Sequence, residues 1–335
     1  MTKISAYAAK QAGAPLEKFQ YELPAIGNEE VDVKVQYCGI CHSDLSMIDN
    51  EWGMSQYPLV PGHEIVGEVI ALGIEVKGLK VGDKVGVGWY AGSCMHCNQC
   101  LDGNQHLCGS AEATIVGRHG GFADTVRSHW SWTIPLPKGI DLKKAGPLLC
   151  GGITVFNPII LAGVKATDRV GVIGIGGLGH MAIKFLKAWG CDVTAFTSNP
   201  AKEKEILAMG AHRVVDSTNP EALADIAGSL NFILNTTNVT LDWNSYLVTL
   251  APQGRFHNVG AVLEPMAIPA FTLLMGEKTV GGSPLGSIAL TKTMLDFCVR
   301  HSIYPTVEEF KMEDVNKAIK HLKEGKARFR IVLKT

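Results

Sequence analysis

A glycine-rich loop between an expected strand and an expected helix constrains the fold of this chain more than any other feature. Gly174, Gly176 and Gly179 follow the pattern G-x-G-x-x-G, directly after the apolar run 169–173 and at the start of a helical run, 178–189. Glycines at this spacing allow a tight turn and a close approach of the backbone to a pyrophosphate, which lies at the helix N-terminus. The loop therefore predicts a dinucleotide-binding domain.

The segments on either side of this loop differ in their patterns. From residue 151 to residue 285 strand-like runs alternate with helical runs, as in the doubly wound parallel sheet of an α/β protein. Residues 1–150 instead carry short valine-containing runs separated by glycine and proline, which predicts antiparallel β structure with many loops. Residues 286–335 hold two helical runs and a terminal strand. We therefore expect domains at 1–150 and 151–285, followed by a C-terminal segment, 286–335.

Four cysteines lie close together in a lobe at about residues 90–110: Cys94, Cys97, Cys100 and Cys108. Two-residue gaps let successive thiolates converge on one ion, and the longer arm supplies a fourth tetrahedral ligand. Four thiolates leave no open position, so the pattern predicts a structural zinc site. An iron–sulfur cluster is an alternative, although the final gap is seven residues and no proline follows the last cysteine. Free cysteines are the other alternative.

A second set of candidate ligands is dispersed along the chain. Cys41 follows an expected strand, and the His63-Glu64 pair precedes another. A thiolate and an imidazole from separate loops bind Zn²⁺ while leaving a position for water or substrate. Cys150 is a candidate for the third ligand, while the alternatives are a structural His-Glu pair and a core cysteine.

The loop after the expected strand 192–197 bears on the choice of dinucleotide. No Asp or Glu stands where an NAD-dependent enzyme would bind the ribose 2′-hydroxyl. Thr197, Ser198 and Asn199, followed by Lys202, suit a 2′-phosphate better, which predicts NADP(H). The alternative is an ordinary loop with a solvated lysine.

Composition excludes several classes of function. Hydrophobic residues make up 46% and the net charge is −1, so the chain has enough apolar residues for buried cores and lacks the basic excess of nucleic-acid-binding proteins. No apolar run reaches the roughly 18 residues of a membrane span, and the start of the chain lacks a signal-peptide core. The nine cysteines are odd in number and clustered, which disfavours a disulfide framework. We expect a soluble, cytoplasmic protein.

Over essentially the whole chain, these segments resemble the zinc-dependent medium-chain alcohol dehydrogenases, in particular their cinnamyl alcohol dehydrogenase branch. The resemblance implies a GroES-like catalytic domain to which residues 286–335 return, a Rossmann domain, and a homodimer. The residues that carry it are Cys41-His-Ser-Asp44, Tyr57-Pro-x-Val-Pro-Gly-His-Glu-x-Val-Gly67, the four-cysteine lobe, Leu148-Leu-Cys-Gly-Gly-Ile-Thr154, Gly174-Ile-Gly-Gly-Leu-Gly-His180 and Met294-Leu-Asp-Phe-Cys298.

The same resemblance implies roles for individual residues. It implies a catalytic zinc ion at Cys41, His63 and Cys150, with Glu64 as an alternating ligand or a neighbour of the ligands. Asp44 would lie near the zinc site, and the Ser43 hydroxyl would exchange a proton with the substrate oxygen. Contacts to NADP(H) would come from Gly174, Gly176, Gly177, Leu178, Gly179, Thr197, Ser198, Asn199, Lys202, Thr236, Gly260, Ser283, Pro284 and Leu285.

Two features depart from the family pattern. The family commonly has a histidine five residues after the first zinc cysteine, where this chain has Ser46, and the stretch between Cys108 and Gly121 is short. Trp52 and Trp89 flank the expected site loops, and we expect them to line an apolar substrate pocket, although each is also suited to core packing.

The resulting hypothesis is an enzyme with two zinc ions per chain. It transfers hydride between NADP(H) and an aromatic or medium-chain primary alcohol or aldehyde, and it has no nucleic-acid or membrane partner. One alternative, an NAD-linked polyol dehydrogenase, is disfavoured by the neutral strand end after Phe196 and by the expected apolar pocket. The other, a non-catalytic zinc-binding protein, is disfavoured by the intact ligands at both metal sites.

Overall fold

Residues 286–335 belong to the same compact unit as the first 150 residues. The computed structural model describes residues 2–335, and its internal contacts define two units. The first unit is Met1–Cys150 with Gly286–Thr335, and the second is Gly151–Leu285.

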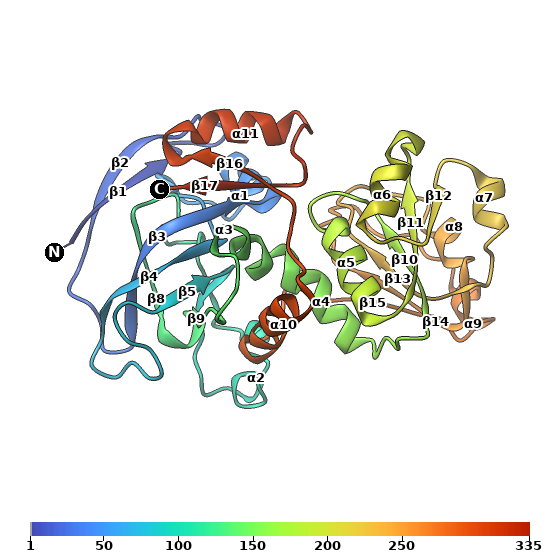
Figure 1. The fold of residues 1–335 in the computed structure, drawn as a ribbon, viewed down its shortest axis with the longest axis horizontal. Helices are drawn as coiled ribbons and strands as arrows, with labels where there is room; N and C mark the ends of the chain where they lie inside the picture. The colour runs from blue at the N-terminus through green and yellow to red at the C-terminus, as the bar shows by residue number, and fades with distance from the viewer. Residues whose placement is uncertain (1) are drawn as a thin grey trace. The chain divides into compact units, whose positions relative to one another are not determined.

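A seven-stranded sheet forms the centre of the first unit. The last strand of the chain pairs antiparallel with a strand from the first 40 residues, which places the C-terminal segment inside this sheet (Figure 1). In spatial order the strands are β16 (Val307–Lys311), β17 (Arg330–Lys334), β3 (Glu30–Ile40), β4 (Ile65–Leu72), β5 (Lys84–Val87) and β9 (Ile134–Pro135), with β8 (Thr125–His129) also paired to β3.

The alternation of side chains in these strands explains the core of the first unit. In β3, Val31, Val33 and Val35 are fully buried, as period-two alternation places successive side chains on opposite faces. They pack with apolar residues of the other strands, including Ile65 and Ile331. The valine-rich runs are therefore the core-facing strands of a largely antiparallel sheet, as the sequence predicts.

Smaller elements of the first unit surround this sheet. Two further ribbons are β1 (Thr2–Ala8) with β2 (Glu17–Leu23), and β6 (Tyr90–Gly92) with β7 (Glu112–Ala113). The helices are α1 (His42–Asp49), α2 (Asn98–Leu101), α3 (Leu142–Ala145), α10 (Ile288–His301) and α11 (Val315–Lys323).

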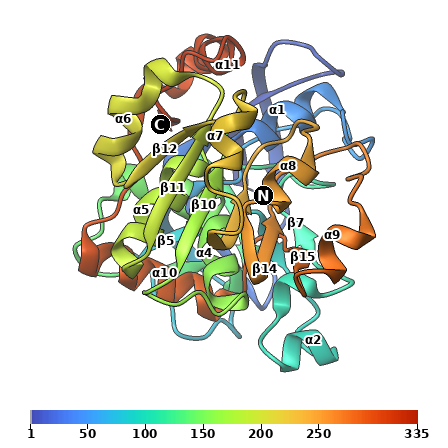
Figure 2. The same ribbon diagram turned by 90° about the vertical axis from the view of Figure 1, so that its right-hand side faces the viewer.

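The second unit is built on a six-stranded sheet whose neighbouring strands are all parallel. The spatial order is β12 (Arg213–Asp216), β11 (Asp192–Thr197), β10 (Arg169–Ile173), β13 (Leu230–Asn235), β14 (Leu250–Asn258) and β15 (Thr279–Gly282). Figure 2 shows green β10 with yellow β11 and β12 on one side and orange β14 on the other. This is the strand order of a dinucleotide-binding sheet, and it confirms the predicted α/β fold class.

Helices connect the strands of this sheet. They are α4 (Gly151–Leu161), α5 (Gly179–Trp189), α6 (Glu203–Met209), α7 (Pro220–Ala224), α8 (Trp243–Leu247) and α9 (Ala270–Leu274). In α5 the buried residues include Met181, Ile183 and Leu186, and the helix ends at Gly190, whose φ of 105° suits glycine. The helical periodicity that follows the glycine loop thus produces a helix with one buried face.

Within residues 2–335, no single helix has the length and apolar composition needed to cross a membrane. Only the helical segments Leu142–Leu149 and Gly151–Leu161, taken together, have that length and composition, and the pair is bent by 56°.

Candidate active site and cofactor-binding site

Four buried side chains of the first unit bring potential metal ligands together. One ligand atom each from Cys41, His63, Glu64 and Cys150 lies within 4.8 Å of all the others. The Cys41 and Cys150 sulfur atoms are 3.9 Å apart, and Nε2 of His63 is 3.2 Å from the Cys150 sulfur. The structure therefore joins residues that are 109 positions apart in the sequence.

Each of these residues lies at the end of an element of the first unit. Cys41 precedes α1, His63 and Glu64 precede β4, and Cys150 follows a 3-10 turn. A glycine in β3 makes the approach possible, because a Cβ atom on Gly39 would lie 2.0 Å from Oε2 of Glu64. The local sequence thus clears space for the carboxylate beside the thiolates.

Asp44 fixes this arrangement through three hydrogen bonds. Its carboxylate accepts from the backbone N–H of Cys41 at 2.9 Å and of Gly62 at 2.8 Å, and it lies 2.9 Å from Nδ1 of His63. An acidic partner on one ring nitrogen of a histidine orients the other nitrogen toward a metal. The family resemblance implies Asp44 near the zinc site, and in the structure Asp44 holds the His63 ring and the start of α1.

Arg330 is a site residue that the sequence analysis missed. It lies in β17, is 4% exposed, and forms an ion pair with the Glu64 carboxylate. Burial raises the pKa of Glu64 to about 7, and the guanidinium of Arg330 opposes that rise. The sequence signal for it was weak. Arg330 stands directly before the apolar run Ile331–Leu333, and an arginine in a buried strand requires a charged partner.

The donor chemistry of this cluster fits zinc. Oε2 of Glu64 is buried and has no hydrogen-bond partner among the described residues. The contact with Cys150 lowers the pKa of Cys41 well below its usual range, and the same contact raises that of Cys150. One thiolate is thus favoured beside one thiol, and a divalent cation that binds two thiolates displaces the remaining proton. Two thiolates and an imidazole suit Zn²⁺ and leave its fourth position open.

The two hydroxyl residues of α1, Ser43 and Ser46, have different partners. The Ser43 hydroxyl is 3.7 Å from the Cys41 sulfur, and His42 is exposed. The Ser46 hydroxyl, at the position where the family commonly has a histidine, donates to the Glu51 carboxylate at 2.6 Å. Glu51, which no sequence motif singles out, places an ionisable group just after the end of α1.

The four cysteines of the lobe also converge. Sulfur atoms of Cys94, Cys97, Cys100 and Cys108 lie within 4.8 Å of one another. The Cys94 sulfur is 3.5 Å from that of Cys108 and accepts a hydrogen bond from the backbone N–H of Cys97. Backbone N–H groups at His96 and Cys97 lower the pKa of Cys94 to about 6. The lobe therefore favours a thiolate, which is the form that binds a structural zinc ion.

The residues expected to bind the cofactor lie at the carboxyl ends of parallel strands in the second unit. Residues 174–179 follow β10, 197–202 end or follow β11, Thr236 follows β13, Gly260 follows β14, and 283–285 follow β15. Parallel strands present these ends along one edge of the sheet, where dinucleotides bind.

The glycine loop has the shape that a pyrophosphate requires. Gly174 has a φ of 85°, and a Cβ atom on Gly179 would lie 2.0 Å from the Gly174 carbonyl oxygen. The Thr236 hydroxyl donates to that carbonyl at 2.7 Å, whereas a Cβ atom on Gly176 would meet no atom within 4 Å. The contacts at Gly174 and Gly179 thus fix the loop on its protein side, while the space beside Gly176 is open. This arrangement fits a dinucleotide at the N-terminus of α5.

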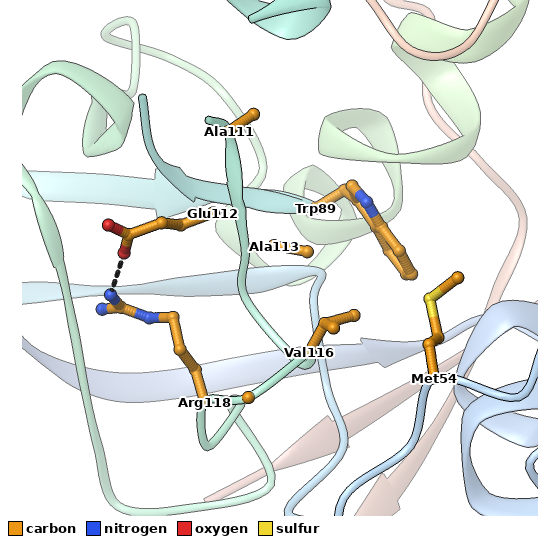
Figure 3. Close-up of a pocket in the computed structure, with 8 residues that line it drawn as sticks. Met54, Trp89, Ala111, Glu112, Ala113, Val116 and Arg118 are labelled. Carbon is orange, nitrogen blue, oxygen red and sulfur yellow. Dashed lines mark hydrogen bonds and ion pairs between the residues drawn. The ribbon is translucent and has the colours of Figure 1, made fainter. Parts of the chain in front are cut away.

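An open apolar cavity of about 660 Å³ lies in the first unit, and its lining includes Trp89, which contacts His63 of the metal-ligating cluster. Trp89, Met54, Ala113 and Val116 line one side, while a Glu112–Arg118 ion pair lies on another (Figure 3). The Trp89 ring meets the His63 ring edge-on, with 4.9 Å between centroids. Trp52 meets Trp89 edge-on at 6.0 Å and is not one of the residues that line the cavity.

His257 in β14 makes the folding stability of the chain depend on pH. Burial lowers its pKa to about 4, below the ordinary value of about 6.5. Between these values the unfolded chain binds the extra proton, so folding stability falls as pH decreases from about 6.5 to 4. We expect the free energy of unfolding, measured with urea, to fall over this pH window in both the native protein and His257→Leu. The fall should be larger in the native protein, by at most about 3 kcal/mol. Equal losses in both proteins would contradict this prediction.

Comparison with known proteins is consistent with this geometry. The family model "Alcohol dehydrogenase GroES-like domain" matches residues 27–138, and "Zinc-binding dehydrogenase" matches residues 177–300. The chain is 57% identical to aldehyde reductase AdhA of Synechocystis sp., over 98% of each chain. A cinnamyl alcohol dehydrogenase structure from Sorghum bicolor superposes with a TM-score of 0.95 at 35% identity, covering 99% of this chain and 98% of that one.

A second solved structure is that of a cinnamyl alcohol dehydrogenase from Helicobacter pylori complexed with NADP(H). It matches with a TM-score of 0.92 at 31% identity, over 99% of this chain and 98% of the other. The chain belongs to the zinc-binding alcohol dehydrogenase family. Within that family its similarity is to the aldehyde reductases and cinnamyl alcohol dehydrogenases, as the sequence motifs predict.

Proposed function

We propose that this chain reduces apolar aldehydes, aromatic or medium-chain, to primary alcohols with NADPH, and catalyses the reverse oxidation with NADP⁺. The convergence of Cys41, His63 and Cys150 carries this proposal, because three protein ligands leave a metal position for substrate. The test is NADPH oxidation with cinnamaldehyde and benzaldehyde, together with metal analysis. Turnover of both aldehydes and two zinc equivalents per chain are expected; bound iron or no turnover would contradict the proposal.

The chain's own residues divide the work of this reaction. Bound zinc acts as a Lewis acid that polarises a carbonyl group, and bound NADP(H) donates or accepts hydride. Cys41, His63 and Cys150 hold the metal, Asp44 orients His63, and Arg330 balances the charge of Glu64. The four-cysteine lobe holds the structural ion.

Ser43 is the proposed proton donor to the substrate oxygen. Its half-buried hydroxyl lies 3.7 Å from the sulfur of Cys41, one of the residues that would hold the metal. A positioned hydroxyl exchanges a proton with a reacting oxygen in this way. The proton route beyond Ser43 is proposed to run through the cofactor ribose to water.

Lys202 is the residue that we expect to favour NADP(H) over NAD(H). It is half-exposed at the end of the Pro200–Lys202 turn, whose start is capped by the Asn199 side chain. Ser198 is exposed beside it, and the first acidic residue after the strand is Glu203. A charge-assisted contact to the 2′-phosphate contributes about 1.5–3 kcal/mol, which corresponds to a preference of about 10-fold to 150-fold.

The matching experiment replaces Lys202 with alanine. The KM for NADPH should rise by about 10-fold or more while kcat/KM with NADH changes little. Lys204→Ala, which removes a neighbouring lysine of α6, is the control and should leave both values unchanged. Native kcat/KM that is equal or higher with NADH would refute the preference.

The cavity beside Trp89 is the proposed binding site for the apolar part of the aldehyde. Ala113→Phe places a ring among Trp89, Met54 and Val116, and should lower kcat/KM for cinnamaldehyde by about 10-fold while changing propanal by less than about 3-fold. Ala25→Phe adds the same ring at an exposed position and should change neither. Equal losses for both aldehydes in Ala113→Phe would contradict this assignment.

We further propose that residues 1–150 and 286–335 form the catalytic domain, that 151–285 binds NADP(H), and that two chains form a homodimer. Three apolar side chains support the dimer, because Phe271, Leu274 and Met275 are 71–73% exposed shortly before β15, which ends the sheet. Sedimentation velocity should give a dimer for the native chain and a monomer for Leu274→Asp.

The nine free cysteines of the described chain support a reducing, cytoplasmic location, which cell fractionation tests.

A further inference from the structure

Two buried polar side chains hold the segment Ser283–Leu285 at both ends. The Ser283 hydroxyl lies 2.9 Å from Nε2 of His257, and the Leu285 carbonyl accepts a hydrogen bond from Nδ2 of Asn157 at 2.6 Å. His257 and Asn157 are 6% and 8% exposed. Between the two contacts stands Pro284, whose ring fixes its own φ. The segment is therefore restrained by side chains at both ends and by its own backbone in the middle.

The surroundings of His257 keep its imidazole neutral. In the sheet it stands opposite Gly281 of β15 and Leu234 of β13, and its ring lies 6.4 Å from that of Phe232. Burial among these uncharged groups lowers its pKa to about 4. At neutral pH, Nε2 thus pairs with the serine hydroxyl without a charge, and neither metal-ligating cluster uses this histidine.

The position of the segment within the sheet indicates which part of a dinucleotide it faces. In a doubly wound sheet each half binds one mononucleotide, on either side of the central strand. The glycine loop follows the central strand β10, and Thr197–Lys202 follows β11 on one side. Ser283–Leu285 follows β15 in the other half. If Lys202 meets the adenosine 2′-phosphate, Ser283–Leu285 lies toward the nicotinamide.

We propose that Asn157 and His257 are positioning residues that clamp Ser283–Leu285 in the shape that receives the nicotinamide half of NADP(H). This inference rests on the proposed function. A segment that is already ordered does not lose its conformational freedom when the cofactor binds, so preorganisation strengthens binding. When either contact is removed, the segment becomes ordered only as the cofactor binds, which costs binding free energy. Only ligands that contain the nicotinamide half should therefore lose affinity.

The test compares two probes on the zinc-loaded protein. One is NADPH, followed by its fluorescence, and the other is 2′,5′-ADP, which carries only the adenosine half and is followed by calorimetry. His257→Leu and Asn157→Leu should each raise the Kd of NADPH by about 10-fold, while the Kd of 2′,5′-ADP should stay within about 2-fold. His257→Gln retains a group able to hydrogen-bond Ser283 and should restore NADPH binding to within about 3-fold of native.

Two further variants separate positioning from packing. Phe232→Leu removes the ring beside His257 but no hydrogen bond, so it should lower the Tm and leave the Kd of NADPH within about 2-fold. Ser283→Ala removes the same hydrogen bond from the loop side without altering the core. If His257 acts through Ser283, adding His257→Leu to Ser283→Ala should weaken NADPH binding no further.

Different results contradict different conclusions. Native affinity for NADPH in both His257→Leu and Ser283→Ala would overturn the clamp and leave the proposed function standing. Equal weakening of NADPH and 2′,5′-ADP would show a general structural role and would also overturn it. A native chain that binds zinc but not NADPH would contradict the proposed function and the clamp together.

Discussion

Replacing Cys150 with alanine should abolish aldehyde reduction while the chain keeps its fold and its structural zinc ion. Cys150 supplies one of the two sulfur atoms of the buried cluster in the first unit, 3.9 Å from that of Cys41. Two remaining strong ligands, Cys41 and His63, hold a zinc ion poorly, and Lewis-acid assistance is worth several kcal/mol. We therefore expect kcat/KM to fall by about 10³-fold or more and zinc content to fall from two equivalents to one.

Two other cysteine variants show whether this loss belongs to the cluster. Cys298→Ala removes a fully buried thiol of α10 that lies in neither metal-ligating group, and should keep both zinc equivalents and full activity. Cys97→Ala removes a ligand of the lobe and should lose one equivalent together with stability, because a structural metal contributes to folding. Full activity in Cys150→Ala, or unchanged zinc content, would show that Cys150 is not a ligand.

The sequence predicted the fold class for a physical reason, and it also offered candidate metal ligands, whose roles stay predictions. A parallel sheet buried on both faces requires apolar runs alternating with amphipathic helices, and β10, α5 and β11 show this periodicity directly. Metal coordination and pyrophosphate binding impose residue types at fixed spacing, which is why Cys94–Cys108 and Gly174–Gly179 are recognisable without a structure.

Contacts that depend on strand pairing left no comparable pattern in the sequence. Arg330 and Glu64 are 266 positions apart and meet because β17 pairs with β3, beside which Glu64 lies. Asn157 and Leu285 are 128 positions apart, and nothing in their spacing links them. The Ser46–Glu51 hydrogen bond is local, but it depends on the chain turning back at Asn50, where α1 ends in a left-handed conformation. These polar partners were therefore visible only in three dimensions.

Arg330→Met should be among the most destabilising single changes in this chain. Its guanidinium neutralises Glu64, which is fully buried, and both side chains lie beside the thiolates of the metal cluster. Removing one partner of a buried ion pair leaves an uncompensated charge and costs about 3–5 kcal/mol, whereas replacing both partners costs far less. Urea unfolding of the zinc-loaded protein should thus show this loss in Arg330→Met and recover much of it in the double variant with Glu64→Gln.

A second buried arginine of the same unit separates stability from activity. Arg127 pairs with Asp32 through two hydrogen bonds of 2.7 and 2.9 Å, and neither residue belongs to a metal-ligating group, so Arg127→Met should lower stability similarly but change kcat/KM by less than about 3-fold. In Arg330→Met the Glu64 side chain loses its charged partner beside the residues that would hold the metal and is free to shift, so kcat/KM should fall by about 10-fold or more with zinc content unchanged. If both arginine variants lose stability and neither loses activity, Arg330 serves the fold alone; if the double variant recovers nothing, the ion pair is not the source of the loss.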